Sequence, residues 1–299
     1  EGAELIFNTM VEEILVEDGK AVGVRTDKGD VYYGSEVVSA VGREGADWFK
    51  DKCEEVGIET TPGTVDVGVR VEVRDEVMQY LNDNLYEAKL IYHTPTFDDK
   101  VRTFCTNPSG EVATEYYENG LAVVNGHAYK SQEYKTNNTN FALLVAKHFS
   151  EPFKDSNGYG ESIARLSNML GGGVIVQRFG DLIRGRRSTP ARIEEAFITP
   201  TLKATPGDLS LVLPKRILDG IMEMIYALDK IAPGTANDDT LLYGVEVKFY
   251  NMEVQVNEKL ESCHKGLYII GDGSGITHSL SHASASGIYV ARNLLEENK

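Results

Sequence analysis

The strongest hydrophobic periodicity of the chain lies between residues 213 and 230. Apolar side chains recur there at intervals of three and four residues: Ile217, Ile221, Met224, Ile225 and Leu228. This spacing puts them on one face of an α-helix. Pro214 fits the first helical turn and Pro233-Gly234 follows the last one. The pattern therefore predicts a helix whose apolar stripe packs into a core.

Shorter patterns predict two more helices. Residues 159–170 form one that ends at three consecutive glycines, Gly171 to Gly173. Residues 47–57 form a short amphipathic helix with one apolar side, made by Trp48, Phe49, Cys53 and Val56. We expect Trp48, the single tryptophan, to pack in a core rather than to stack on a ligand.

Alternation of apolar and polar residues predicts strands elsewhere. At the start of the chain the predicted strands are residues 4–7, 11–16, 21–26, 31–33 and 36–40. Asp-Gly and Asp-Lys-Gly-Asp segments between them are hairpin signals, so this part is expected to be a β-meander. From residue 85 to 129 further strand-like runs are broken by turns, and residues 241–256 return to strands, which predicts a β-rich insert with helices.

Residues 64–73 show strict period-two alternation. One face of the predicted strand carries Val65, Val67, Val69, Val71 and Val73. The other face carries Asp66, Arg70 and Glu72, and polar residues in such positions are usually solvated. The alternative is that these three side chains line a substrate cavity.

The last part of the chain combines a strand, a glycine turn and a helix. The buried strand is Leu267 to Ile270, the turn is Gly271 to Ile276, and small or apolar residues recur at helical spacing from Ser279. Glycines in such a turn let backbone approach a ligand closely, and the N–H groups at a helix start favour an anion. Asp272 only accepts hydrogen bonds when ionised, so it suits a sugar hydroxyl.

This segment resembles the carboxy-terminal flavin signature of FAD oxidoreductases with two dinucleotide-binding domains. A closer resemblance, to the uncharacterised FAD-dependent dehydrogenases of the NAD(P)/FAD-dependent oxidoreductase superfamily, extends over nearly the whole chain. It is carried by residues 38–43 with 47–49, 66–72, 101–105, 124–127, 176–181 and 239–244.

The resemblance implies a cofactor and its binding residues. FAD is expected to contact the turn through Gly271, Asp272, Gly273, Ser274, Gly275 and Ile276, and to lie near Gly42 and Arg43, where the chain leaves the flavin domain. Hydride transfer through the flavin is the implied reaction, with NAD(P)H as a candidate electron partner. Ser274 and residues 277–282 depart from the usual family pattern, so the sugar contacts are better defined than those of the flavin ring.

The implied fold class is α/β with an α+β insert. A partial FAD/NAD(P)-binding, Rossmann-like domain comprises residues 1–46 and 255–299, and an inserted substrate domain of mixed sheet and helices comprises residues 47–254. A G-x-G-x-x-G fingerprint is absent: Ile276 breaks one near match and Val174 follows the other glycine run. We therefore expect the carboxy-terminal, truncated part of a longer flavoprotein, with weak or no FAD binding by itself.

Composition and charge limit the classes of molecule that the protein is expected to bind. The chain has 299 residues, 30 Lys and Arg against 46 Asp and Glu, and a net charge of −16. This balance argues against nucleic acid and anionic membrane as partners, since both require basic surface. Three widely spaced cysteines without a C-x-x-C pair indicate reduced thiols, and no apolar run suggests a membrane span, so a cytoplasmic protein is expected.

One basic cluster interrupts this acidic chain: Arg178, Arg184, Arg186 and Arg187. Guanidinium groups bind carboxylate or phosphate in bidentate fashion, which makes these arginines candidates for an anionic small-molecule substrate or for the flavin pyrophosphate. Ion pairing with the chain's own acids is the open alternative.

His278 is a candidate contact to the flavin or the substrate. His278 and His282 are four residues apart and would share a helix face, but Ser279 stands where an H-E-x-x-H zinc motif has glutamate. No metal site is therefore predicted, and no catalytic acid or base can be named.

The sequence thus predicts a fragment of an FAD-dependent dehydrogenase, inactive by itself. Two other functions stay open. One is a ligand-binding domain without catalysis of its own. The other is a flavin reductase of the geranylgeranyl type, which a large apolar tunnel in the insert would favour.

Overall fold

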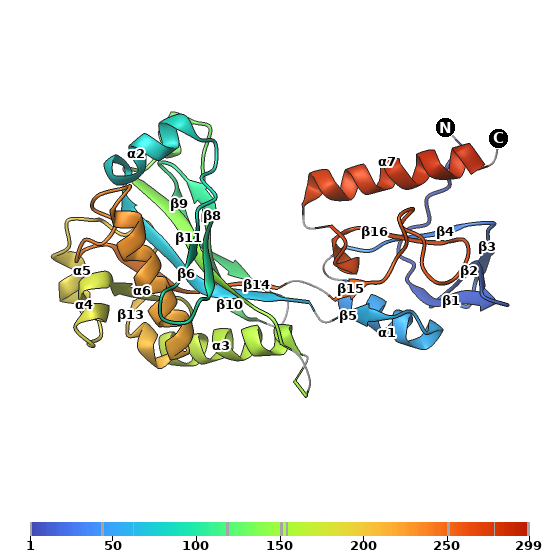
Figure 1. Ribbon diagram of the computed structural model, residues 1–299, viewed down its shortest axis with the longest axis horizontal. Coiled ribbons are helices and arrows are strands. Elements are labelled where there is room, and N and C mark those ends of the chain that lie inside the picture. Colours follow the sequence, from blue (N-terminus) through green and yellow to red (C-terminus); the bar gives the residue numbers. More distant parts are fainter. Residues whose placement is uncertain are drawn as a thin grey trace. The chain divides into compact units, whose positions relative to one another are not determined.

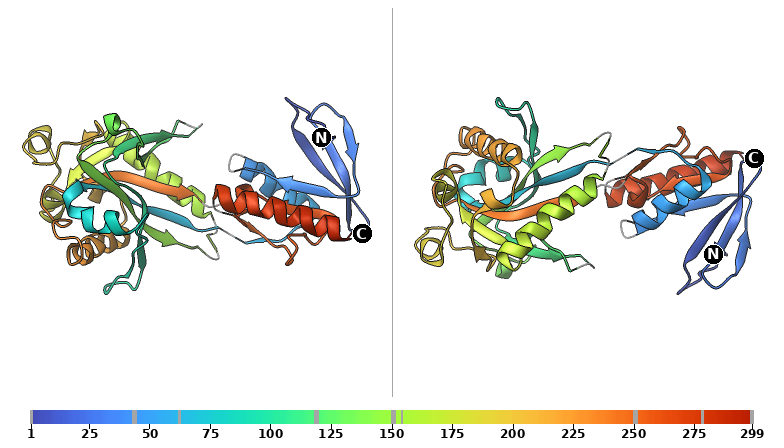
Figure 2. Two further views of the ribbon diagram at one scale, coloured as in Figure 1. Left: turned by 90° about the horizontal axis from the view of Figure 1, so that it is seen from above. Right: turned by 90° about the horizontal axis from the view of Figure 1, so that it is seen from below.

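The computed structural model describes residues 2–42, 45–61, 63–117, 120–149, 152–153, 155–249, 252–277 and 279–297. It divides the chain into two compact units. Unit 1 consists of residues 1–64, 150–154 and 250–299, and unit 2 of residues 65–149 and 155–249. Both terminal stretches of the chain therefore belong to unit 1, and unit 2 is inserted into it (Figure 2).

Unit 2 is built on a mixed seven-stranded sheet with the order β13-β12-β14-β6-β11-β8-β7 (Figure 1). The strands are β6 (Val65–Arg74), β7 (Ile91–His93), β8 (Lys100–Asn107), β11 (Asn138–Lys147), β12 (Ile175–Arg178), β13 (Thr205–Pro206) and β14 (Leu241–Phe249). Only the short β12–β13 pair is parallel. The α/β fold class with a mixed-sheet insert is confirmed.

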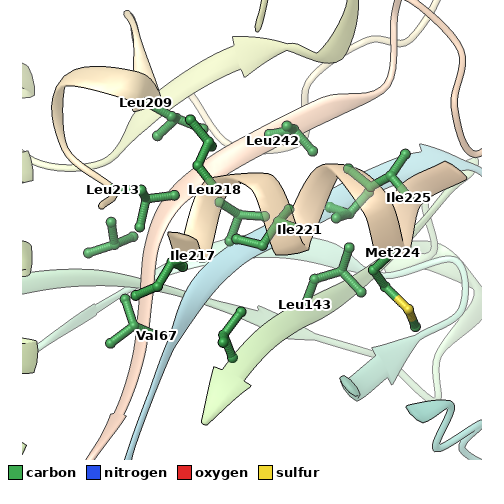
Figure 3. Close-up of a cluster of buried hydrophobic side chains, with 14 of the residues drawn as sticks. Val67, Leu143, Leu209, Leu213, Ile217, Leu218, Ile221, Met224, Ile225 and Leu242 are labelled. Atoms are coloured by element: carbon green, nitrogen blue, oxygen red, sulfur yellow. The ribbon is translucent and has the colours of Figure 1, made fainter. Parts of the chain in front are cut away.

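Helices surround this sheet. They are α2 (Asp75–Asn84), α3 (Ser156–Gly171), α4 (Phe179–Ile183), α5 (Pro190–Glu194) and α6 (Lys215–Asp229). The predicted amphipathic helix is α6, and its stripe packs on the valine face of β6 and on neighbouring strands, where Ile217 and Ile221 lie close to Val67 and Leu143 (Figure 3). The packing of α6 on β6 therefore explains why each of these two elements carries an apolar face.

The opposite, polar face of the sheet is covered by a hairpin of β9 (Glu111–Tyr116) and β10 (Ala122–His127). Asn125 of β10 accepts a hydrogen bond from Arg70, which points away from the valine face of β6. The polar residues of β6 are consequently not solvated: Asp66, Arg70 and Glu72 are at most 1% exposed. The expectation of solvated side chains at these positions is wrong, because a second sheet layer covers them.

Unit 1 contains an antiparallel meander and a parallel strand pair. The meander is β1 (Val11–Glu17), β2 (Lys20–Thr26) and β3 (Val31–Tyr33), and the pair is β4 (Val37–Ala40) with β16 (Leu267–Ile270). A short antiparallel pair joins β5 (Thr60–Thr61) to β15 (Glu253–Val254). Helices α1 (Ala46–Val56) and α7 (Leu280–Glu297) complete the unit.

The strand predicted at residues 4–7 is wrong. Residues 4–7 form no strand, and Leu5 and Phe7 are each 74% exposed, because no neighbouring strand pairs with them. The compact units meet at residues 64/65 and 249/250, and Phe49 and Cys53 of α1 and Val254 of β15 pack in the core of unit 1. The domain bounds at 46/47 and 254/255 stay predictions. The roles of the units as flavin and substrate domains stay predictions.

None of the helices in the part of the chain that the structure describes is long and apolar enough to cross a membrane.

Candidate flavin-binding turn

The glycine turn after β16 packs directly against the backbone at the end of β4. Gly271 has a φ of 86° and Gly275 a φ of 73°, a region that favours glycine. A Cβ atom on Gly273 would lie 2.4 Å from the carbonyl oxygen of Gly42. The Gly273 N–H donates to the Val41 carbonyl at 2.8 Å. Glycine at these positions is therefore required by close backbone approach.

Side chains inside the turn hold its shape. Ser274 is fully buried, and its Oγ donates to the Gly271 carbonyl at 2.6 Å. Thr277 Oγ1 donates to Asp272 Oδ1 at 2.5 Å, which fixes the orientation of that half-buried carboxylate. Ser274 thus stabilises the turn through its internal hydrogen bond. Asp272 is the acidic side chain of the turn.

The helix that follows the turn begins as expected. Ser279 precedes α7, accepts a hydrogen bond from the His282 N–H at 3.2 Å through its Oγ, and accepts another from the Ala283 N–H through its carbonyl. This is the arrangement of an N-cap residue. The positive end of α7 is therefore close in sequence to the glycine turn.

The structure brings most of the predicted cofactor-binding residues together. Gly42 and the Gly271–Ile276 turn lie side by side, and a Cβ atom on Gly42 would meet no atom of the described residues within 4 Å. Gly42 is exposed, so a side chain at this position would not clash with the described part of the protein. Arg43 and His278 lie outside the residues that the structure describes.

These residues fit the demands of a dinucleotide. Its sugar hydroxyls require an acceptor, which the oriented Asp272 carboxylate supplies, and its pyrophosphate requires backbone N–H donors, which a helix start supplies. Within the turn, the N–H groups of residues 273–276 already donate to acceptors of the protein itself. Open space beside Gly42 meets the steric requirement.

The basic cluster belongs to unit 2 and is paired with the chain's own acids. Arg178 pairs with Asp239, and Arg184 with Asp238 at 2.6 Å. Arg186 binds Asp181 at 2.8 Å.

Asp181 is the centre of this cluster. It is fully buried and accepts a hydrogen bond from Ser188 Oγ at 2.8 Å. Burial raises the pKa of Asp181, but hydrogen bonds from Ser188 and Arg186 outweigh it and hold the pKa below its usual value. Self-pairing therefore occupies Arg178, Arg184 and Arg186. Arg187 is exposed, and its carbonyl accepts a hydrogen bond from Arg192.

Unit 2 contains a buried network of charged side chains that the sequence did not predict. Arg70 binds Glu246 through two hydrogen bonds of 2.7 and 2.6 Å, and both side chains are fully buried. The Asn140 side chain accepts a further bond from Arg70 at 3.0 Å. A Cβ atom on Gly126 of β10 would lie 2.7 Å from an Arg70 nitrogen, so glycine there lets the hairpin approach the guanidinium.

Glu72 forms a second buried group on the same face. Its carboxylate accepts hydrogen bonds from the Tyr243 hydroxyl at 2.6 Å, from Asn138 Nδ2 at 3.0 Å and from Thr201 Oγ1 at 2.5 Å. Burial, with the adjacent Glu72 charge, raises the pKa of Tyr243 well above its ordinary value. The only sequence signal for both groups was the polar alternation of β6.

Among the described side chains no group of three or more His, Cys, Asp or Glu is arranged to hold a metal ion. His282 lies exposed on α7, and the three cysteines are free thiols.

The fold defines the class of protein, and comparison with known proteins defines the family. The fold is that of a mixed α/β protein with an inserted seven-stranded sheet. The chain belongs to the family described as FAD-dependent protein, C-terminal domain-like, which matches residues 64–249. The resemblance to FAD-dependent proteins is thereby confirmed.

An uncharacterised protein of Clostridium beijerinckii is 28% identical over 315 residues, and the match covers 99% of this chain and 58% of that relative. The chain therefore spans little more than half of the relative's length.

Solved structures give weaker likenesses. An oxidoreductase from Methanosarcina mazei is 14% identical, with 95% of this chain and 49% of that chain covered and a TM-score of 0.34. Glycerol-3-phosphate dehydrogenase from Bacillus halodurans, complexed with FAD, is 12% identical, with coverage of 97% and 39% and a TM-score of 0.26.

Proposed function

We propose that this chain is the carboxy-terminal part of an FAD-dependent oxidoreductase and that its glycine turn holds the cofactor. The observation that carries the proposal is the close packing of the Gly271–Ile276 turn against Gly42, with open space beside Gly42 and an oriented carboxylate at Asp272. Membership of an FAD-dependent family supports it.

Asp272, Thr277 and the start of α7 have defined tasks in this proposal. Asp272 accepts a hydrogen bond from a sugar or ribityl hydroxyl, and Thr277 keeps its carboxylate in place. The positive end of α7 favours the negative charge of the pyrophosphate and of the reduced ring. When bound, FAD supplies the hydride acceptor or donor.

Unit 2 is proposed as the substrate domain for a small molecule that we do not name. Because the structure pairs Arg178, Arg184 and Arg186 with aspartates, an anionic substrate would have to compete with Asp181, Asp238 or Asp239. Arg187 is the arginine of the predicted set for which no acidic partner is seen among the described residues. NAD(P)H remains the proposed electron partner, and dehydrogenase activity belongs to the longer protein.

A flavin titration tests the proposal. The chain and the longer product of its native gene are titrated with FAD, and flavin absorbance and fluorescence are followed. We expect the longer protein to bind and this chain to bind weakly or not at all. In the longer protein, Asp272→Ala should weaken binding by about tenfold, the value of one lost charged hydrogen bond. Asp27→Ala, an exposed position on a turn of the meander, is the matched control.

A longer protein that is colourless and takes up no FAD would contradict the proposal and favour a ligand-binding domain without catalysis.

A further inference from the structure

A lysine, an asparagine and a glutamate from three strands of unit 2 meet where the β9–β10 hairpin lies on the large sheet. Lys248 belongs to β14, Asn125 to β10 and Glu115 to β9. Glu115 Oε2 accepts a hydrogen bond from Asn125 Nδ2 at 3.0 Å and lies 3.6 Å from Lys248 Nζ. One carboxylate oxygen therefore contacts both a primary amine and a carboxamide.

The Asn125 amide is held in one orientation. Its Oδ1 accepts hydrogen bonds from the Gly126 N–H at 2.8 Å and from Arg70 Nη2 at 3.4 Å. Exchanging Oδ1 and Nδ2 would turn an NH2 group toward these two donors and a carbonyl oxygen toward Glu115, so only the present orientation satisfies all three contacts. Two donors on Oδ1 stabilise the negative charge that develops there when a nucleophile adds to Cγ.

Lys248 is largely removed from water beside this amide. Its side chain is 12% exposed, and Nζ lies 3.4 Å from Glu246 Oε1 as well as close to Glu115. Glu246 already accepts two hydrogen bonds from Arg70, which compensates most of its charge. Glu115 is therefore positioned to take a proton from Nζ. A lysine amine acts as a nucleophile when it is desolvated and can lose a proton, and holding both reactants on one carboxylate supplies the proximity that the reaction needs.

We propose that Lys248 and Asn125 become joined by an isopeptide bond between their side chains. Nζ gives a proton to Glu115 and adds to Cγ, the carbonyl electron pair moves onto Oδ1, and the Cγ–Nδ2 bond then breaks. Glu115 carries protons from Nζ to the leaving nitrogen. The lysine ammonium and the asparagine amide are thereby converted into a secondary amide and an ammonium ion. Atoms and charge balance, and the step requires no further reactant.

The bond ties the covering hairpin to the sheet beneath it. β10 and β14 belong to different sheets, and their residues 125 and 248 are far apart in the chain. Closing so long a loop restricts the unfolded chain and stabilises the fold, as a disulfide does. The cross-link therefore keeps the buried layer around Arg70 covered. It does not depend on flavin binding.

Mass spectrometry of the unfolded chain tests the proposal. We expect an intact mass that is lower than that of the sequence by one molecule of ammonia. Trypsin, which cleaves after unmodified lysine and arginine, should release a branched peptide that joins residues 103–130 to residues 231–259. Lys248→Arg keeps the positive charge but lacks the primary amine, and should have its full sequence mass. Lys147→Arg, at the partly buried ion pair with Asp99, is the matched control and should still lose ammonia.

Glu115→Gln tests the proton transfer separately. Its side-chain carbonyl can still accept the hydrogen bond from Asn125, but it cannot carry a proton. Loss of ammonia, followed over time after purification, should therefore be at least about a hundredfold slower than in the parent chain. Loss at the parent rate would contradict the mechanism.

An intact mass equal to that of the sequence, with separate tryptic peptides for residues 103–130 and 231–248, would overturn the proposal. Loss of ammonia that persists in Lys248→Arg would also overturn it, because the Gly126 nitrogen would then have closed a succinimide on Asn125. Should Lys248→Arg misfold, the presence or absence of the branched peptide in the unmodified chain gives the same decision. Failure of the protein to bind FAD would leave these masses unchanged.

Discussion

Arg70 and Glu246 form a fully buried ion pair, Nη2 to Oε1 at 2.6 Å, between two neighbouring strands of the sheet in unit 2. Burial lowers the pKa of Arg70, but the Glu246 carboxylate outweighs it and raises the pKa above its ordinary value. Arg70 is therefore charged in the folded protein. Their mutual attraction compensates for the loss of water around them.

Breaking this pair should destabilise the protein strongly. Glu246→Gln leaves a buried guanidinium without its counter-charge, so we expect a loss of about 3–5 kcal/mol in the free energy of unfolding. Urea denaturation of unit 2 measures it. Arg165→Ala, at the exposed Arg165–Glu161 pair, should cost no more than about 1 kcal/mol. Equal losses of unfolding free energy in the two variants would show that the buried pair stabilises the protein no more than the exposed pair does.

Replacing both partners should be less harmful than replacing one. The double variant Arg70→Met with Glu246→Leu removes both charges at once, and we expect it to be more stable than Glu246→Gln. Urea denaturation midpoints compare the stability of the two variants. A double variant that is less stable than Glu246→Gln would contradict the expectation that an unpaired buried charge is the main cost.

Asp181 should make stability depend on acid pH. Because its pKa is lower in the folded chain than in the unfolded one, it stabilises the fold above the unfolded value of about 3.9, and this contribution is lost as the pH falls through the folded pKa. Asp181→Asn should lower stability at pH 7 by about 1–3 kcal/mol and flatten its decline between about pH 5 and 3. The exposed Asp83→Asn in α2 is the control, and its pH profile should follow the parent.

Two glycines of the candidate site should respond differently to alanine. In Gly273→Ala the new Cβ would meet the Gly42 carbonyl at 2.4 Å, so the turn must shift, at a cost of about 1–3 kcal/mol. Gly42→Ala meets no atom within 4 Å and should leave thermal stability nearly unchanged. Thermal unfolding compares the two. In the longer protein, Gly42→Ala should still weaken FAD binding, since the side chain enters the space proposed for the cofactor.

The cysteines should differ sharply in reactivity. Burial raises the pKa of Cys53 to about 12, with a smaller contribution from the adjacent Cys263. Cys263 is exposed. Iodoacetamide at about pH 8 should therefore modify Cys263 in the folded protein and Cys53 only after unfolding, because the thiolate is the reactive species. Peptide mass spectrometry reads both sites. Modification of Cys53 in the folded state would contradict its burial in the core of unit 1.

Elements with a long, regular pattern were predictable. α6 carries a full apolar stripe and β6 alternates over ten residues, so each element specifies its own conformation. α2 was missed because only Met78 and Leu81 are buried and Arg74 before it gives no capping hydrogen bond. Residues 4–7 have strand-like composition, but a strand also needs a partner, which the sequence does not reveal.

The candidate site was predictable where its residues are consecutive. Gly271–Ile276 follow one another, and their turn was expected. Arg70 and Glu246 are 176 positions apart, and alternation in β6 cannot tell whether a second layer covers the polar face. The arginines of the basic cluster are close in sequence, and Asp181, the partner of Arg186, lies among them. Asp238 and Asp239, which pair with Arg184 and Arg178, come from a distant segment that the local sequence does not reveal.

The insertion of unit 2 into unit 1 has a consequence for synthesis on the ribosome. β4 is made early, whereas its partner β16 follows only after the whole of unit 2. At roughly 5–20 residues per second, the nascent β4 waits on the order of 10–50 seconds for that partner. Unit 2 emerges complete within this interval and can fold first. Until β16 appears, the edge of β4 that pairs with it stays open, so the nascent chain is exposed to chaperones and to misassembly at this strand.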